Sequence, residues 1–282
     1  MKRRPGGLAL AGAVFALFGV VPVNADDRIS FAEVPSAALG RALPVTIVAP
    51  AGVKPASHVP VLFFLHGRGR HHRSLIDEPA ARAAFLAAPF YTIMPQGEDG
   101  WYIDSPSRPT DRYATYLAEV VEWAESNLPI ARDAARRGIA GWSMGGYGAV
   151  RFAQMNPGHF GFVASVIGLL DFPRAETLPV GQNYTVPIQR FTADPAVWAS
   201  FNPIFAIAAL RETTLTLVLA TRGFELTMNE SFLAAIASAG LPPPRVHRLE
   251  GGHQFPLVIQ AVPLVLADAG ETFARASVVS KP

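Results

Sequence analysis

The order of apolar segments constrains this fold more than any other feature, because short apolar runs alternate with segments of helical spacing. Residues 60–65 read PVLFFL, a continuous apolar run typical of a strand buried on both faces. Residues 111–127 instead carry apolar side chains at the spacing of one helix face. Alternating strands and helices fold into a largely parallel sheet with helices on both faces, so the sequence predicts an α/β protein.

The other expected elements follow the same reasoning. A coarse reading predicts strands at 29–34, 43–48, 60–65, 91–94, 138–142, 162–169, 214–220 and 245–249. Helical spacing predicts helices at 74–87, 111–127, 144–155, 229–239 and 256–274. Residues 171–202 interrupt the alternation and are rich in Pro, Thr and Asn. Long irregular insertions in compact domains are usually functional, so we interpret 171–202 as a short cap insertion over the site.

The first residues predict export. Three basic residues at positions 2–4 precede an uncharged stretch that is almost wholly apolar from 8 to 23 and ends in small residues before Asp26. This is the layout of a secretory signal peptide. The alternative, a retained transmembrane anchor, would need about 20 apolar residues. We therefore predict a signal peptide at 1–25, a single domain at 26–282, a secreted or periplasmic location, and no stable membrane insertion after cleavage.

Charge and cysteine content exclude several classes of function. The leader holds three of the 24 basic residues, so the mature chain carries 21 basic against 22 acidic residues, a net charge near −1. The scattered Arg residues do not predict a nucleic-acid surface, which requires basic residues gathered on one face. The chain has no cysteine, which excludes disulfides, thiolate catalysis and cysteine-ligated metals. The adjacent pair His71 and His72 does not predict a metal site, because neighbouring side chains rarely face one ion.

A candidate nucleophile lies where a predicted strand turns directly into a helix. Gly141-Trp142-Ser143-Met144-Gly145 matches the G-x-S-x-G pattern at this junction. The sharp turn forces Ser143 into a strained backbone conformation and exposes its hydroxyl, while the two glycines avoid collisions with the neighbouring strand and helix. The helix also points free N–H groups at the site. The alternative is a serine that merely caps the helix.

Several motifs occur together between residues 59 and 256: Leu65-His66-Gly67, Trp101-Tyr102-Ile103-Asp104, Gly141-Trp142-Ser143-Met144-Gly145-Gly146-Tyr147-Gly148, Pro157 with Phe160, and Gly251-Gly252-His253. In these motifs the chain resembles the putative esterase family, which includes esterase D, feruloyl esterases, siderophore esterases and mycolyltransferases. The resemblance implies the α/β-hydrolase fold and ester hydrolysis, or acyl transfer to an alcohol, without a metal or an organic cofactor.

The histidine that activates Ser143 should come late in the chain, after the last strand. Of seven histidines, only His247 and His253 lie late enough. His247 falls inside a predicted strand, whereas His253 follows its carboxyl end, the edge at which open α/β sheets place their sites. We therefore predict His253 as the base. For the oxyanion hole we predict the backbone N–H groups of Met144 and Arg68, while His66 is interpreted as structural.

The acid of the triad departs from the family pattern. Gly-x-x-Asp is usual after the penultimate strand, but this segment reads Ala220-Thr221-Arg222-Gly223-Phe224-Glu225. Glu225 is the closest carboxylate, and its extra methylene could compensate for a small backbone shift. The alternative is a solvated loop charge, with Asp171, Asp194 and Glu250 as fall-back acids.

Together these features predict an exported serine carboxylic-ester hydrolase that forms an acyl-enzyme on Ser143. Its substrate is expected to be a small-molecule or polymeric ester, with Trp101, Tyr102 and Trp142 as candidate walls of the binding site. Asp104 is expected to order the loop that follows the aromatic pair. Two alternatives stay open: an acyltransferase to a sugar or lipid alcohol, and a non-catalytic exported binding protein with a degenerate triad.

Overall fold

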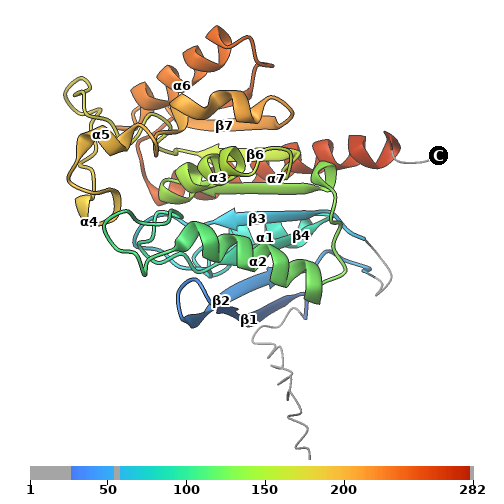
Figure 1. The fold of residues 1–282 in the computed structure, drawn as a ribbon. Coiled ribbons are helices and arrows are strands. Elements are labelled where there is room, and N and C mark those ends of the chain that lie inside the picture. The colour runs from blue at the N-terminus through green and yellow to red at the C-terminus, as the bar shows by residue number, and fades with distance from the viewer. Residues whose placement is uncertain (1–26, 54–57, 280–282) are drawn as a thin grey trace, which may run out of the picture.

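A computed structural model describes residues 27–53 and 58–279. The signal peptide predicted at 1–25 lies outside these residues. The described chain forms one eight-stranded sheet with helices on both faces (Figure 1).

The sheet has the strand order β1-β2-β4-β3-β5-β6-β7-β8. Strands β1 and β2 form an antiparallel hairpin, β2 pairs antiparallel with β4, and the remaining neighbours pair in parallel. The mostly parallel sheet predicted from the apolar runs is therefore confirmed. The strands are β1 (Ile29–Ser36), β2 (Arg41–Val48), β3 (Val61–Leu65), β4 (Tyr91–Pro95), β5 (Arg137–Trp142), β6 (Phe162–Val166), β7 (Thr214–Ala220) and β8 (Arg245–Leu249).

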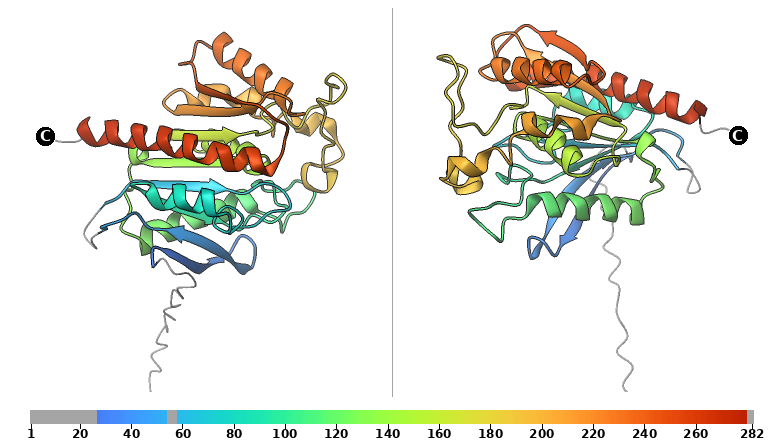
Figure 2. Two further views of the ribbon diagram at one scale, coloured as in Figure 1. Left: turned by 180° about the vertical axis from the view of Figure 1, so that it is seen from behind. Right: turned by 45° about the horizontal axis from the view of Figure 1, so that its top comes forward.

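Helices cover both faces because the central strands are apolar on both. In β3, Leu62 and Phe64 enter a core beneath α1 and α7, while Phe63 and Leu65 enter a second core beneath α2, α3 and α6. The view from behind in Figure 2 shows α7 and α1 on the face opposite α2 and α3. The helices are α1 (Pro79–Ala87), α2 (Tyr113–Asn127), α3 (Met144–Met155), α4 (Ile188–Phe191), α5 (Pro195–Trp198), α6 (Leu226–Ser238) and α7 (Phe255–Val279), with 3₁₀ segments at η1 (Ala134–Arg136) and η2 (Pro203–Leu210).

Among the described helices, α7 is the one whose length and composition would allow it to cross a membrane. Half of its apolar window is buried, and Val262, Val265 and Ala269 are fully buried against the sheet. The core of this domain thus accounts for the apolar character of α7.

Several element boundaries differ from the sequence prediction by a few residues, and two of these differences have a clear local cause. The helix expected from residue 74 begins at Pro79, because proline suits the first helical turn and residues 74–76 form turns instead. The strand expected to reach 169 ends at Val166, since Ile167 has a φ of +43° and leaves the extended conformation.

The insertion at 171–202 holds only two four-residue helices, α4 and α5. In Figure 1 it lies at one end of the sheet. Its contacts are with loops that follow β3, β4 and β7, so it sits at the carboxyl ends of the parallel strands.

Candidate active site

The serine lies in a sharp turn between β5 and α3. Ser143 has a φ of +54°, a left-handed conformation that a non-glycine residue adopts only under strain. The two flanking glycines are needed sterically. A Cβ at Gly141 would lie 2.4 Å from the carbonyl oxygen of Gly145, and one at Gly145 would lie 2.3 Å from that of Leu65. The turn therefore has the geometry expected from the G-x-S-x-G pattern.

Three residues from the carboxyl ends of three strands form one chain of hydrogen bonds. His253 Nε2 lies 2.8 Å from Ser143 Oγ, and His253 Nδ1 lies 2.8 Å from Glu225 Oε2. Glu225 is fully buried at the start of α6, and His253 lies in the loop between β8 and α7. An ionised carboxylate can only accept, so it holds the proton on Nδ1 and leaves Nε2 free to accept the serine proton.

The buried carboxylate of Glu225 packs directly against the backbone of Gly223, where there is no side chain to exclude it. A Cβ at Gly223 would lie 2.2 Å from Glu225 Oε1 and 2.5 Å from Oε2. Glu225 Oε1 makes no hydrogen bond within the part of the chain that the structure describes. The carboxylate is thus held by His253 on one oxygen and by close packing around the other.

The fall-back carboxylates are held elsewhere. Asp171 pairs with Arg174 and accepts a hydrogen bond from Asn202 Nδ2 at 2.8 Å. Asp194 caps α5, and Glu250 is exposed and accepts a hydrogen bond from Thr221. Of the acids weighed from the sequence, the structure brings Glu225 to the histidine.

The two amides expected to bind an oxyanion are near Ser143. The Met144 N–H belongs to the first turn of α3, and Arg68 follows Gly67, whose backbone lies against the Trp142 indole. Among the described residues, neither N–H donates a hydrogen bond. Both amides therefore lack a hydrogen-bond acceptor in the described chain, as expected for oxyanion donors.

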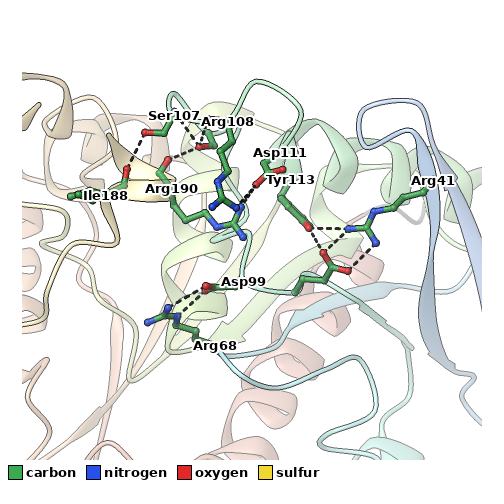
Figure 3. A network of polar contacts seen from close by, with 11 residues as sticks. Arg41, Arg68, Asp99, Ser107, Arg108, Asp111, Tyr113, Ile188 and Arg190 are labelled. Atoms are coloured by element: carbon green, nitrogen blue, oxygen red, sulfur yellow. Dashed lines mark hydrogen bonds and ion pairs between the residues drawn. The ribbon is translucent and has the colours of Figure 1, made fainter. Parts of the chain in front are cut away.

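The Arg68 side chain is fixed in place by a separate set of contacts. Its guanidinium forms a two-pronged ion pair with Asp99, at 2.8 and 3.2 Å, which is visible in Figure 3. It also donates a hydrogen bond to the Tyr184 hydroxyl at 3.1 Å. These contacts hold the backbone that carries the candidate oxyanion donor.

His66 has a structural place, as the sequence suggested. The Gly97 N–H donates to His66 Nε2 at 2.8 Å, and His66 Nδ1 lies 2.8 Å from the Gly67 oxygen. Burial lowers the pKa of His66 from 6.5 to about 4, so the ring stays neutral near pH 7 and links the loops after β3 and β4.

A cavity of about 130 Å³ opens beside Ser143 and His253. Trp142, one of the walls expected from the sequence, lines this cavity. Its other apolar walls are Ile167, Phe255 and Val258, and its polar walls include Arg68, Arg70 and Gln254.

Trp101 and Tyr102 do not line this cavity, in contrast to the walls expected from the sequence. Each is 1% exposed and has a φ of +54°. The Trp101 ring packs among aromatic side chains that include Tyr147 and Phe191, and the Tyr102 hydroxyl accepts a hydrogen bond from the His66 N–H at 3.1 Å. Both side chains are therefore buried, and Tyr102 supports the site through its contact with His66.

Asp104 orders the next loop as expected. Its two carboxylate oxygens accept hydrogen bonds from the Thr115 N–H at 2.9 Å and the Thr115 hydroxyl at 2.6 Å. They thereby cap the first turn of α2.

The insertion contributes residues that the sequence analysis missed. Tyr184 stacks on Phe224 with ring centroids 5.4 Å apart, and Phe224 contacts the His253 ring at 4.4 Å. Gln182 Oε1 accepts hydrogen bonds from the Thr227 N–H and hydroxyl, both at 3.0 Å, at the start of α6. Isolated side chains in an irregular segment follow no period, so no sequence signal marked them.

A second set of contacts ties the insertion to the loop before α2, as Figure 3 shows. Arg190 pairs with Asp111, and the Ser107 hydroxyl donates to the Ile188 oxygen at 2.9 Å. The Ser105 hydroxyl donates to the Arg190 oxygen at 2.8 Å. The insertion is thus anchored on both sides of the site.

Comparisons with known proteins identify the family of this chain. A family model described as "Putative esterase" matches residues 36–238. "Esterase Rv1288" from Mycobacterium tuberculosis strain H37Rv is 26% identical over 263 residues, which cover 82% of this chain and 56% of the relative. The chain therefore spans little more than half the length of this curated relative.

Solved structures show the same fold. The fluorophosphonate-binding serine hydrolase FphF of Staphylococcus aureus has a TM-score of 0.74 at 17% identity, with 85% of this chain and 97% of that chain covered. A ferulic acid esterase has a TM-score of 0.70 at 20% identity, with 86% and 97% covered. The family match over most of the sequence and these fold neighbours lead to one assignment: the chain belongs to the Esterase family and has the α/β-hydrolase fold.

Proposed function

We propose that this protein is a serine esterase that hydrolyses carboxylic esters through an acyl-enzyme on Ser143. The observation that carries the proposal is the unbroken hydrogen-bond chain from Ser143 through His253 to the buried Glu225, with 2.8 Å at each step. A serine hydroxyl is a weak nucleophile unless a positioned base takes its proton, and this chain supplies such a base. Membership of the Esterase family supports the same activity.

In the first half of the reaction, Ser143 Oγ attacks the ester carbonyl carbon while its proton passes to His253 Nε2. The carbonyl oxygen becomes an oxyanion and accepts hydrogen bonds from the Met144 and Arg68 N–H groups. When the tetrahedral intermediate collapses, the bond to the alcohol oxygen breaks and His253 returns the proton to that oxygen. The alcohol leaves, and the acyl group stays on Ser143.

In the second half, a water molecule attacks the acyl carbon and gives a proton to His253 Nε2. The bond to Ser143 Oγ then breaks, the serine recovers that proton, and the carboxylic acid departs. Throughout, Glu225 holds the ring orientation and stabilises the imidazolium that forms in each half. The three residues need no further group to balance the reaction.

We further propose that the enzyme acts outside the cytoplasm, in the periplasm or the medium. The support is the basic start, apolar stretch and small-residue end of residues 1–25. Fusing these residues to a periplasmic reporter enzyme tests this directly. Export of the reporter supports the proposal, and retention in the cytoplasm contradicts it.

The central test measures hydrolysis of p-nitrophenyl butyrate by Ser143→Ala. We expect turnover to vanish while the circular dichroism spectrum stays unchanged. Ser126→Ala is the matched control, because the Ser126 hydroxyl is exposed on α2 and donates only to the Glu122 carbonyl. Retained turnover in Ser143→Ala would overturn the nucleophile assignment.

Two further measurements separate the alternatives. Labelling of Ser143 by a fluorophosphonate probe requires an activated serine, so absence of the label would favour a non-catalytic binding protein. Adding an alcohol during turnover shows whether the acyl group goes to water or to the alcohol. A dominant transester product would favour the acyltransferase.

A further inference from the structure

The cavity beside the serine is lined by two arginines and by no acidic side chain. Arg68 and Arg70 both come from the loop after β3, and they share the cavity wall with Ser143 and His253. No Asp or Glu belongs to its described lining. A cavity of about 130 Å³ with this lining favours a negatively charged ligand over a neutral or cationic one.

The two arginines differ in what holds them. Arg68 is already paired with Asp99 and Tyr184, so its guanidinium stabilises the loop. The Arg70 guanidinium carbon lies 4.0 Å from the centroid of the Phe255 ring. No hydrogen bond or ion pair involves the Arg70 guanidinium in the described part of the chain. An arginine that rests on an aromatic face keeps its N–H groups free at the edge of the guanidinium plane.

Arg73, in the same loop, has an aromatic neighbour like that of Arg70 but lies outside the cavity. Arg73 also lies over an aromatic ring, 5.0 Å from the centroid of Phe31. It is paired with Asp77 at 2.9 Å, and it does not line the cavity. Arg70 thus combines an aromatic support, an unpaired charge and a place in the wall beside the nucleophile.

From these contacts we infer that the cavity accepts esters that carry an anionic group, a carboxylate or a phosphate, close to the scissile bond, and that Arg70 binds this group. The inference rests on the proposed esterase function and adds the substrate class. The guanidinium fork matches the two oxygens of such a group, and the Phe255 ring restricts its orientation before the substrate arrives. Arg70 is therefore the specificity-determining residue for the charged part of the substrate.

The test compares pairs of esters that differ only in charge. For the acyl half, p-nitrophenyl hydrogen adipate is compared with its neutral methyl ester. For the alcohol half, 4-acetoxybenzoate is compared with methyl 4-acetoxybenzoate. The quantity measured is the ratio of kcat/KM for the anionic ester to kcat/KM for its neutral partner, after subtraction of the rate with Ser143→Ala.

We expect Arg70→Gln to lower this ratio about tenfold at low ionic strength in at least one of the two pairs, as loss of one charge-assisted contact in a partly exposed site implies. Arg70→Lys should recover part of the ratio, because it keeps the charge without the fork. Added NaCl should lower the ratio of the wild type, since salt screens this attraction. The affected pair then shows whether the anionic group belongs to the acyl or the alcohol half.

Arg73→Gln is the control and should leave both ratios within about twofold of the wild type, because the same change of charge is then made outside the cavity. Unchanged ratios in Arg70→Gln for both pairs would overturn the inference, while hydrolysis through Ser143 would still stand. Should Arg70→Gln not fold, a wild-type ratio that does not respond to NaCl would overturn it equally. Hydrolysis that persists in Ser143→Ala would instead refute the proposed function itself.

Discussion

A methyl group at position 223 should disable the site without unfolding the protein. In Gly223→Ala the new Cβ would lie 2.2 Å from Glu225 Oε1, whereas ordinary contacts begin near 3.4 Å. The carboxylate must therefore move by about 1.2 Å, the difference between these two distances. Gly223 does not have a left-handed φ, so alanine fits its backbone and the conflict is with the glutamate.

The size of the effect follows from that displacement. A shift of this size takes Glu225 out of hydrogen-bond distance of His253 Nδ1, which is now 2.8 Å away. A misplacement of about 1 Å can cost about 100-fold in rate, and loss of the acid costs about 10⁴-fold in well-studied triads. We therefore expect Gly223→Ala to lower kcat by a factor between about 10² and about 10⁴. The free energy of unfolding should fall by only about 1–2 kcal/mol, because the group displaced is the end of a side chain.

The assay is steady-state hydrolysis of p-nitrophenyl butyrate combined with urea unfolding. Gly252→Ala is the matched control, because a Cβ there would meet only the Arg222 oxygen at 3.6 Å. In the double variant Gly223→Ala, Glu225→Gln, the two losses should not add, since both act through the same hydrogen bond. A Gly223→Ala enzyme within about threefold of the wild type, or losses that multiply in the double variant, would refute the reasoning.

Three further predictions concern the supports of the site. Glu225→Gln should lower kcat by about 10³–10⁴-fold with an unchanged fold; an unaffected rate would move the role of the acid to another carboxylate. Gln182→Ala removes the acceptor of the Thr227 N–H and the donor to the Gly223 oxygen, so urea unfolding should show a loss of about 1 kcal/mol, whereas Gln182→Glu keeps only the acceptor and should retain part of that stability. Because burial lowers the pKa of His66 from 6.5 to about 4, the unfolded chain binds a proton that the folded chain does not. The free energy of unfolding should therefore decrease as pH falls from 6.5 to about 4, by up to about 3 kcal/mol, and His66→Gln should remove this part of the slope in urea titrations at a series of pH values.

Much of the fold could be predicted because its signals are local. The strand expected at 60–65 matches β3 to within one residue, since a parallel strand buried on both faces needs an unbroken apolar run. The turn at Ser143 was equally readable, because its steric demand falls on glycines two residues away in the same segment. Boundaries were less reliable where a single φ value decided them, as at Ile167.

The residues around the serine could not all be predicted from the sequence, because their positions depend on how loops that are distant in the sequence meet. From the sequence, Glu225 was one of four candidate acids, and its spacing departed from the family pattern. It reaches His253 because β7 and β8 are neighbours in the sheet and because Gly223 leaves room for the longer side chain. Trp101 and Tyr102 are buried and lie at two consecutive left-handed residues, a conformation that no pattern of apolar positions encodes.

The sequence alone therefore determined the class of fold and the serine turn, because the strands, helices and turn are each encoded within one short segment. The exported leader stays a prediction from the sequence. The tertiary structure decided which carboxylate meets the histidine, which arginine is left unpaired over Phe255, and how Gln182 and Tyr184 brace the loop that carries the acid. These contacts join loops that follow different strands, and they form because the sheet brings the carboxyl ends of its parallel strands to one edge.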